Sequence, residues 1–193
     1  MSPSVWYVSY GSNMASSRFA CYLLGGRPAG GTRTNPGARD RSLPTRSVPV
    51  DLPGTVYFAG ASAQWGGGVA FYDHLTPGVS VGRGYLVSTA QFADIAAQEM
   101  RRVPQEHDPL EAVVSAPLVD GRHTAGPGRY ETLVEVGRKD DVPLLTFTSP
   151  HGATHEPHTR PSQAYLDQLR LGLRESQGWD DDAVEDYLRR IAA

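Results

Sequence analysis

The residue best placed for proton transfer is Glu99, near the end of a helix that the sequence predicts over about 89–101. Phe92, Ile95 and Ala96 form the apolar face of this helix, and Glu99 follows them by seven, four and three residues, so it lies on the same face. A carboxylate on an apolar face is unfavourable unless it is paired or hydrogen-bonded. Glu99 therefore either reaches solvent or an arginine at the helix end, or points into a cavity as an acid/base.

A second candidate is the turn Tyr10-Gly11-Ser12-Asn13, which follows a strand expected over 5–10 and precedes a helix. Glycine adopts positive φ freely and asparagine tolerates it, so Gly11 and Asn13 suit a tight turn of that kind. Successive N–H groups in such a turn, together with a helix N-terminus, attract anionic or carbonyl oxygens. The alternative is an ordinary strand-to-helix turn.

Three histidines, His151, His155 and His158, lie close together in the sequence and suggest a zinc site if the segment were helical. Gly152 and Pro157 disfavour that helix, so a polar loop is the alternative. The chain has neither a His-Glu-x-x-His motif nor a Gly-x-Ser-x-Gly elbow. A metal-dependent amide hydrolase or deacylase stays open as a rival function.

These residues must be positioned by an α+β fold with a mixed, barrel-like sheet of about five to seven strands and flanking helices. The expected caps are Ser16, Asp180 and the capping box of Ser88 with Gln91. We expect a single domain over residues 1–193. Strands are predicted at 5–10, 55–59, 67–72, 82–87, 130–136 and 144–148, and helices at 16–24, 89–101, 162–174 and 181–191.

The stretch 27–54 lacks periodicity and reads as a long loop with at most short strands. Long loops inside compact domains are often functional. Its arginines either meet an anionic part of a substrate or are simply solvated. They are Arg27, Arg33, Arg39, Arg41 and Arg46.

Composition narrows the function classes. The net charge of −3 and the 20% of charged residues argue against non-specific nucleic-acid binding. No apolar run reaches the length of a membrane span, and residues 1–10 do not resemble a signal peptide. The single cysteine, Cys21, cannot form an internal disulfide. We expect a cytoplasmic protein with a small-molecule partner, no nucleic-acid or membrane partner, and a monomeric or homodimeric state.

The order of motifs resembles the γ-glutamylcyclotransferase-like family. The resemblance lies in Tyr-Gly-Ser-Asn after the first strand, a glycine-flanked strand at 65–69, a strand at 84–87 and the helix ending in Glu99. It continues with a strand opening at Tyr130 and a closing helix with Pro161-Ser162-x-x-Tyr165 and Gly172. These motifs cover most of the chain in the family's order.

The resemblance implies release of an amine from a γ-glutamyl amide, with formation of 5-oxoproline and without a cofactor. It makes Glu99 the catalytic acid/base and assigns substrate binding to Tyr10, Gly11, Ser12, Asn13 and Tyr130. The chain departs from the family pattern in three places. Met100 replaces the glycine after the glutamate, alanine replaces an acidic residue before it, and Phe147 stands where a tyrosine is common. These departures leave a non-catalytic binder on the same fold as a further alternative.

Overall fold

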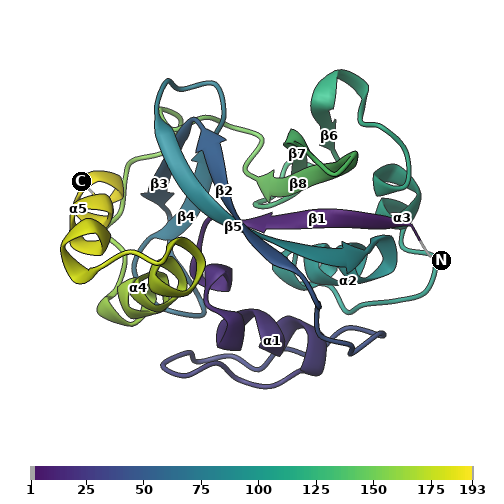
Figure 1. The fold of residues 1–193 in the computed structure, drawn as a ribbon, viewed down its shortest axis with the longest axis horizontal. Helices are drawn as coiled ribbons and strands as arrows, with labels where there is room; N and C mark the ends of the chain where they lie inside the picture. The colour runs from purple at the N-terminus through teal and green to yellow at the C-terminus, as the bar shows by residue number, and fades with distance from the viewer. Residues whose placement is uncertain (1–2, 193) are drawn as a thin grey trace.

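The computed structural model describes residues 3–192, which form eight β-strands and five α-helices (Figure 1). The strands are β1 (Ser4–Ser9), β2 (Ser47–Pro53), β3 (Thr55–Ala59), β4 (Val69–Asp73), β5 (Val79–Ser88), β6 (Arg122–Thr124), β7 (Thr132–Lys139) and β8 (Val142–Thr148). The helices are α1 (Ser16–Leu24), α2 (Thr89–Glu99), α3 (Pro109–Val114), α4 (Gln163–Gln177) and α5 (Asp181–Ile191), with 3₁₀ turns η1 (Ser12–Met14) and η2 (Val119–Gly121).

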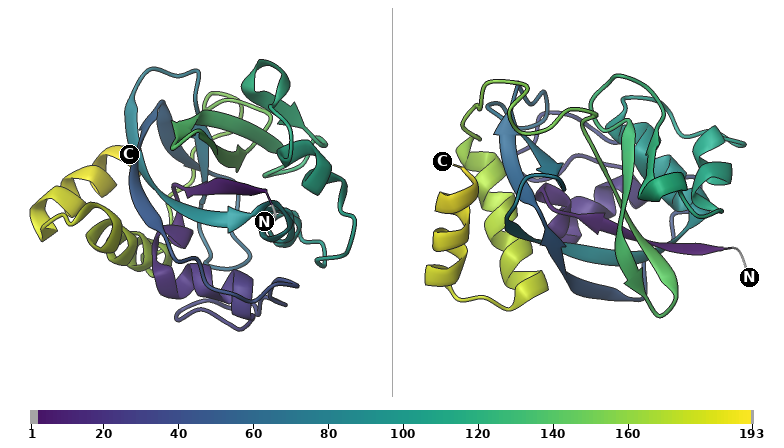
Figure 2. Two further views of the ribbon diagram at one scale, coloured as in Figure 1. Left: turned by 45° about the vertical axis from the view of Figure 1, so that its right-hand side comes forward. Right: turned by 90° about the horizontal axis from the view of Figure 1, so that it is seen from above.

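Six strands form a mixed sheet in the order β2-β5-β1-β8-β7-β6. Strand β1 is antiparallel to β5 and parallel to β8, and its residues Val5 to Ser9 are all buried, as expected for a strand covered on both faces. Helices α4 and α5 lie side by side at one end of the molecule, and α3 lies at the other (Figure 2).

The hairpin β3–β4 closes the sheet into a barrel-like ring through two hydroxyl groups. The Oγ of Ser80 on β5 accepts from the N–H of Val56 (3.0 Å) and donates to the carbonyl of Gly54 (3.1 Å). The Oγ1 of Thr148 on β8 accepts from the N–H of Tyr72 (3.0 Å) and donates to its carbonyl (2.7 Å). The ring β1–β5–β3–β4–β8 is thus continuous, with side chains in place of a ladder at two seams.

The predicted α+β class and the mixed, barrel-like sheet are confirmed. The capping box is present, since Ser88 Oγ accepts from the N–H of Gln91 and Gln91 Oε1 accepts from the N–H of Ser88. Asp180 caps α5 as expected. The extent of the domain over residues 1–193 stays a prediction, and Met1, Ser2 and Ala193 lie outside the described residues.

The prediction that Ser16 caps α1 is wrong. Ser16 is the first helical residue, and Ala15 stands at the cap position without a side-chain hydrogen bond. The exposed N–H of Ser16 donates instead to Glu175 Oε2 of α4 (2.8 Å). A carboxylate from another helix therefore satisfies the helix start, a contact that local sequence cannot reveal.

Other elements also differ from the prediction. Strand β2 has seven residues, and Pro49 and Pro53 are tolerated because β2 lies at the edge of the sheet. Helix α3 is missing from the prediction although Asp108 followed by Pro109 marks its start. The strand expected from Tyr130 begins at Thr132, because Tyr130 has a φ of 62°. The short β6 also went unpredicted.

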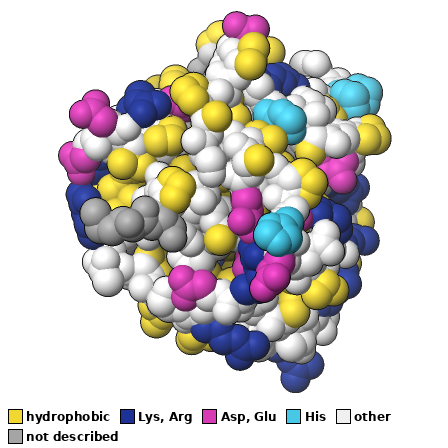
Figure 3. Space-filling model, turned by 90° about the vertical axis from the view of Figure 1, so that its right-hand side faces the viewer, with side chains coloured by type: hydrophobic (Ala, Val, Ile, Leu, Met, Phe, Trp, Pro, Cys, Tyr) yellow, Lys and Arg dark blue, Asp and Glu magenta, His cyan; other side chains and the backbone are white. Residues whose placement is uncertain are grey.

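Within residues 3–192, no helix is both long enough and apolar enough to cross a membrane. The face at the end that carries α3 shows acidic, basic and apolar side chains interspersed, so neither sign of charge dominates there (Figure 3).

Gly172 sets how closely α4 approaches η1. A Cβ at this position would lie 2.5 Å from Met14 Cβ and 2.7 Å from the backbone nitrogen of Ala15. We predict that Gly172→Ala destabilises the fold by about 1–3 kcal/mol, the usual effect of overpacking. Helix propensity alone predicts the opposite sign, a gain of about 1 kcal/mol. Urea unfolding decides between them, with exposed Leu171→Ala on the same helix as the control.

Candidate functional site

A pocket of about 580 Å³ opens beside the end of β1. That volume suits a small molecule. Its floor comes from β1, η1 and α1, and its rim comes from segments 33–36, 61–65, 98–103 and 128–131. All six residues predicted for the site, Tyr10, Gly11, Ser12, Asn13, Glu99 and Tyr130, line it. Elements distant in sequence therefore converge on one cavity.

Glu99 is the last residue of α2 and is half-buried. Its Oε1 accepts hydrogen bonds from Asn13 Nδ2 (3.1 Å) and from the hydroxyl of Tyr22 on α1. Within residues 3–192, Oε2 makes no hydrogen bond. One carboxylate oxygen is thus held in place while the other is available to a molecule in the pocket.

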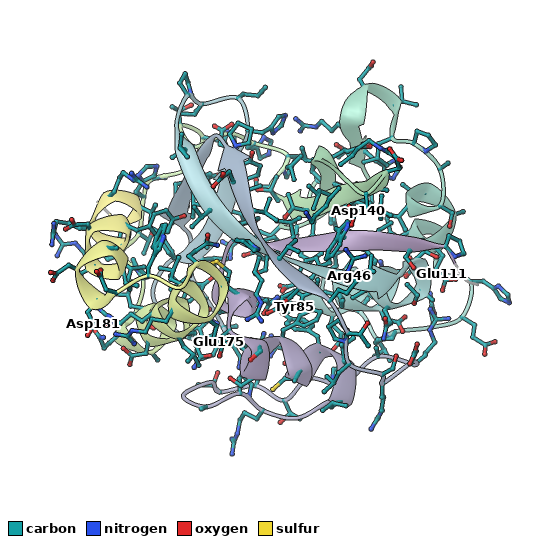
Figure 4. The ribbon with its side chains drawn as sticks, viewed as in Figure 1. Arg46, Tyr85, Glu111, Asp140, Glu175 and Asp181 are labelled. Carbon is teal, nitrogen blue, oxygen red and sulfur yellow. The ribbon has the colours of Figure 1, made fainter. Side chains whose placement is uncertain are left out.

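The loop between β1 and α1 is not the positive-φ turn that the sequence suggests. Gly11 has φ −119° and ψ −149°, and residues Ser12 to Met14 form η1. The loop is held from below by Tyr85 on β5, whose hydroxyl lies 2.9 Å from the carbonyl of Asn13 and 3.0 Å from that of Met14. Figure 4 labels Tyr85 near the centre of the molecule, with Glu175 of α4 close by.

Close packing, rather than φ, accounts for glycine at position 11. A Cβ at Gly11 would lie 2.9 Å from the hydroxyl oxygen of Tyr165 on α4. Tyr165 also stacks on Trp65 with ring centres 5.9 Å apart, so it cannot withdraw freely. Burial, with Glu99 acting in the same direction, raises the pKa of Tyr165 to about 12, so its hydroxyl stays neutral.

Asn13 connects the loop to the carboxylate. Its Nδ2 donates to Tyr7 OH (2.9 Å) as well as to Glu99, and its Oδ1 is buried without a hydrogen-bond partner in the described part of the chain. An unsatisfied buried oxygen is unfavourable by about 1–3 kcal/mol. Burial, and then Glu99, raise the pKa of Tyr7 well above its usual value, so Tyr7 also remains neutral.

Tyr10 and Tyr130 form walls of the pocket, but their hydroxyls are already engaged. Tyr10 donates to the carbonyl of Phe147 (2.9 Å), and Tyr130 donates to that of Ala70 (2.7 Å). Burial raises the pKa of both well above the usual value. Positive φ in a non-glycine residue is strained, and such strain concentrates at functional sites, which fits the place of Tyr130 here.

The structure fits Met100 and Phe147, two of the departures from the family pattern, without strain in the backbone at Met100 or loss of the pocket wall at Phe147. Met100 has φ −77°, so this position needs no glycine, and the left-handed residue is Arg101 with φ 59°. Phe147 lines the pocket and packs on Tyr7 with ring centres 5.3 Å apart, so its ring occupies the wall without adding a hydroxyl.

The histidines do not converge. The rings of His151 and His155 stack 3.8 Å apart, whereas His158 Nε2 lies 2.9 Å from the carbonyl oxygen of Ala153. In the part of the chain that the structure describes, no group of three or more His, Cys, Asp or Glu is placed to hold a metal ion.

Two of the five arginines of segment 27–54 form ion pairs with carboxylates that do not line the pocket. Arg39 pairs with Asp94 (2.9 Å) and with Glu111, and Arg46 pairs with Asp140 (2.6 Å), as Figure 4 shows for the latter. Of the five, only Arg33 lines the pocket. Of the two alternatives left open for these five arginines, contact with a substrate in this pocket therefore fits Arg33 and not the other four.

Four further side chains line the pocket with Glu99 but are not among the residues predicted from the sequence, namely Tyr7, Arg18, Tyr22 and Tyr165. Arg18 is the informative omission, since it is only 4% exposed and lies four residues before Tyr22 on the inward face of α1. A charged residue on an apolar face is the signal that identified Glu99, and it was present for Arg18 as well.

No known family model matches the sequence. Among curated proteins, the chain is 30% identical over 203 residues to histone deacetylase 5 of Arabidopsis thaliana. The match covers 98% of this chain and 31% of that protein, so the chain spans about a third of its relative's length.

Solved structures share the fold. The chain matches a gamma-glutamyl cyclotransferase (TM-score 0.57, 16% identity, 97% of this chain and 88% of that chain) and an uncharacterized protein from Homo sapiens (0.54, 16%, 97% and 88%). It also matches YkqA from Bacillus subtilis (0.52, 18%, 97% and 54%). The chain therefore has the γ-glutamyl cyclotransferase fold, as its motif order predicts.

The contact at Gly11 yields a test of how the loop is held. We predict that Gly11→Ala destabilises the protein by about 1–3 kcal/mol, because the new methyl group overlaps the Tyr165 hydroxyl. Tyr165→Phe removes that oxygen and leaves the ring. Urea unfolding of the double variant should recover most of the loss relative to Tyr165→Phe alone. Additive losses would contradict the assigned contact.

Proposed function

We propose that this chain is a γ-glutamylcyclotransferase-type enzyme that releases an amine from a γ-glutamyl amide. The substrate's α-amine attacks its own γ-carbonyl carbon, the C–N bond to the departing amine breaks, and 5-oxoproline forms without consuming water. The nucleophile belongs to the substrate, so holding it against the carbonyl accounts for much of the rate. The chemistry is redox-neutral and needs no cofactor.

The observation that carries this proposal is the carboxylate of Glu99, fixed through Oε1 and open at Oε2 in a pocket of small-molecule size. Glu99 takes a proton from the attacking nitrogen and returns one to the leaving nitrogen. A single carboxylate can perform both transfers in sequence. Burial raises the pKa of Tyr7 and of Tyr22, so both hydroxyls stay neutral and neither competes with Glu99 as a base.

The loop of Tyr10, Gly11, Ser12 and Asn13 binds the γ-glutamyl group in this proposal. The first N–H groups of a helical turn have no partner inside the turn, so those of Ser12 and Asn13 suit the substrate's carboxylate or its developing oxyanion. The buried Oδ1 of Asn13 supplies an acceptor for the α-ammonium group. Tyr10 and Tyr130 contribute ring surface.

We predict that Glu99→Gln lowers kcat at least about 100-fold, since the amide cannot carry the proton. Glutamine keeps the shape of the side chain, so the midpoint of thermal unfolding should change little. The measurement is release of 5-oxoproline from a panel of γ-glutamyl amides. Glu106→Gln is the matched control, because Glu106 is exposed and does not line the pocket. Full activity of Glu99→Gln would remove Glu99 from the mechanism.

A second candidate is amide hydrolysis. One relative is named a histone deacetylase, and deacylation is the hydrolysis of an amide. The same panel, extended with an acetyl-lysine peptide, separates the two reactions. Free glutamate or acetate would indicate hydrolysis, whereas 5-oxoproline indicates cyclisation. Ligands that raise the unfolding temperature without any turnover would indicate a binding protein on the same fold.

The arginines on the rim of the pocket indicate the kind of amine that the reaction releases. Arg33, Arg101 and Arg129 line the pocket and are absent from the ion pairs among residues 3–192. Arg102 also lines it but pairs with Asp108 (2.6 Å). The protein as a whole has a net charge of −3, and the face in Figure 3 is mixed, so this positive rim is local. We propose that the departing amine carries an acidic group.

We predict a preference for γ-glutamyl-alanine over its neutral carboxamide in kcat/KM. An exposed ion pair contributes up to about 1 kcal/mol, a factor of about five, so the loss of two arginines in Arg33→Gln with Arg101→Gln should reduce the preference by up to about 30-fold. Added salt should reduce it too. Arg27→Gln with Arg41→Gln is the matched control, since both residues are exposed and lie outside the pocket lining. Equal losses in the two double variants would contradict a specific role for the rim.

A further inference from the structure

Arg18 is a buried charge without a carboxylate partner. It lies on α1, is 4% exposed and lines the pocket, yet it is absent from the ion pairs among the described residues. Its Nη1 donates to Asn35 Oδ1 (3.2 Å) and its Nη2 to Tyr22 OH (2.9 Å), and Nε has no partner there. Such burial is unfavourable for folding, so stability does not explain the residue.

The hydrogen bonds that link Arg18, Tyr22 and Glu99 can be assigned donors and acceptors in only one way. A guanidinium can only donate, so the Tyr22 oxygen accepts from Arg18 and its single hydrogen must point elsewhere. The acceptor within reach is Glu99 Oε1. The order Arg18 to Tyr22 to Glu99 therefore follows from the donor chemistry.

The arginine is itself fixed from two sides. Its guanidinium carbon lies 4.3 Å from the centre of the Tyr22 ring. Asn35, which accepts from Nη1, is held by two backbone hydrogen bonds with Gly26, of 2.8 and 3.0 Å. The segment after α1 thus anchors Arg18, and Arg18 anchors the hydroxyl of Tyr22.

The protonation states of Tyr22 and Arg18 agree with hydrogen bonds that run from Arg18 to Tyr22 and from Tyr22 to Glu99. Burial raises the pKa of Tyr22 well above its usual value against the opposing influence of Arg18, and Glu99 raises it further. The hydroxyl therefore keeps its hydrogen. Burial lowers the pKa of Arg18, but Tyr22 and Glu99 outweigh it, so the pKa is raised and the guanidinium stays charged.

We infer that Arg18 is a positioning residue that acts through Tyr22, directing the Tyr22 hydroxyl to Oε1 of Glu99 so that Oε2 faces the reacting molecule. Arg18 itself does not touch the reacting atoms. The catalytic consequence rests on the proposed function, whereas the orientation of the hydroxyl does not.

The kinetic test is a double-mutant cycle with Arg18→Met, Tyr22→Phe and both together. Methionine fills a similar volume, and replacing a buried charge by an apolar side chain is often tolerated. Each single change should lower kcat about 10- to 100-fold with KM changed less than about threefold. The double variant should be no worse than Tyr22→Phe, since Arg18 then has no hydroxyl to orient. Arg18→Lys should recover part of kcat.

A second readout does not depend on turnover. In the wild-type protein, NMR should show a slowly exchanging, downfield hydroxyl proton that disappears in Tyr22→Phe and so is assigned to Tyr22. It should shift or be lost in Arg18→Met and persist in Leu24→Ala, an exposed position on the same helix.

The kinetic cycle and the NMR signal distinguish failure of the proposed function from failure of the role inferred for Arg18. Absence of turnover on every γ-glutamyl amide would refute the proposed function, while the hydroxyl proton would still decide the orientation. Lack of that resonance in the wild type, or its persistence unchanged in Arg18→Met, would overturn the inference. Kinetic losses that multiply in the double variant would overturn it as well.

Discussion

The hydrogen bond from Asn13 to Glu99 joins two parts of the chain that are 86 residues apart, and the pocket exists because they meet. Asn13 is carried by the loop after β1, whereas Glu99 ends α2. Strand pairing of β1 with β5 brings them together, since α2 begins where β5 ends. The register places the start of α2 near Ser4, at the far end of β1 from the loop, and the 11 residues of α2 bring Glu99 back to the loop.

Much of the remaining structure holds this meeting point rigid. The hydroxyl of Tyr85 supports the loop by hydrogen bonding to the carbonyl oxygens of Asn13 and Met14. Helix α4 places the hydroxyl of Tyr165 against Gly11. Glu175, on the same helix as Tyr165, holds the start of α1. A site held within a fraction of an ångström requires such second contacts, because side chains on loops alone are too mobile.

Helical periodicity was sufficient to place Glu99, because a capping box fixed the start of α2 and hence its phase. The class of fold followed from the order and type of the elements. The same reasoning does not identify Arg18, because the other buried side chains of α1 (Phe19, Tyr22 and Leu23) are those of an ordinary core-facing helix. The conformation of Gly11 was also missed, because the contact that demands glycine comes from Tyr165 on α4, which is remote in sequence. Long-range contacts of this kind leave no local pattern.

The two hydroxyl seams of the barrel have a consequence for local stability. The hairpin β3–β4 is joined to the six-stranded sheet by the hydroxyls of Ser80 and Thr148 rather than along a full ladder, so its attachment depends largely on its buried side chains, among them Phe58 and Tyr72. The segment 61–65 that links its strands forms part of the pocket rim. The packing of these side chains in the core therefore also positions part of the pocket rim.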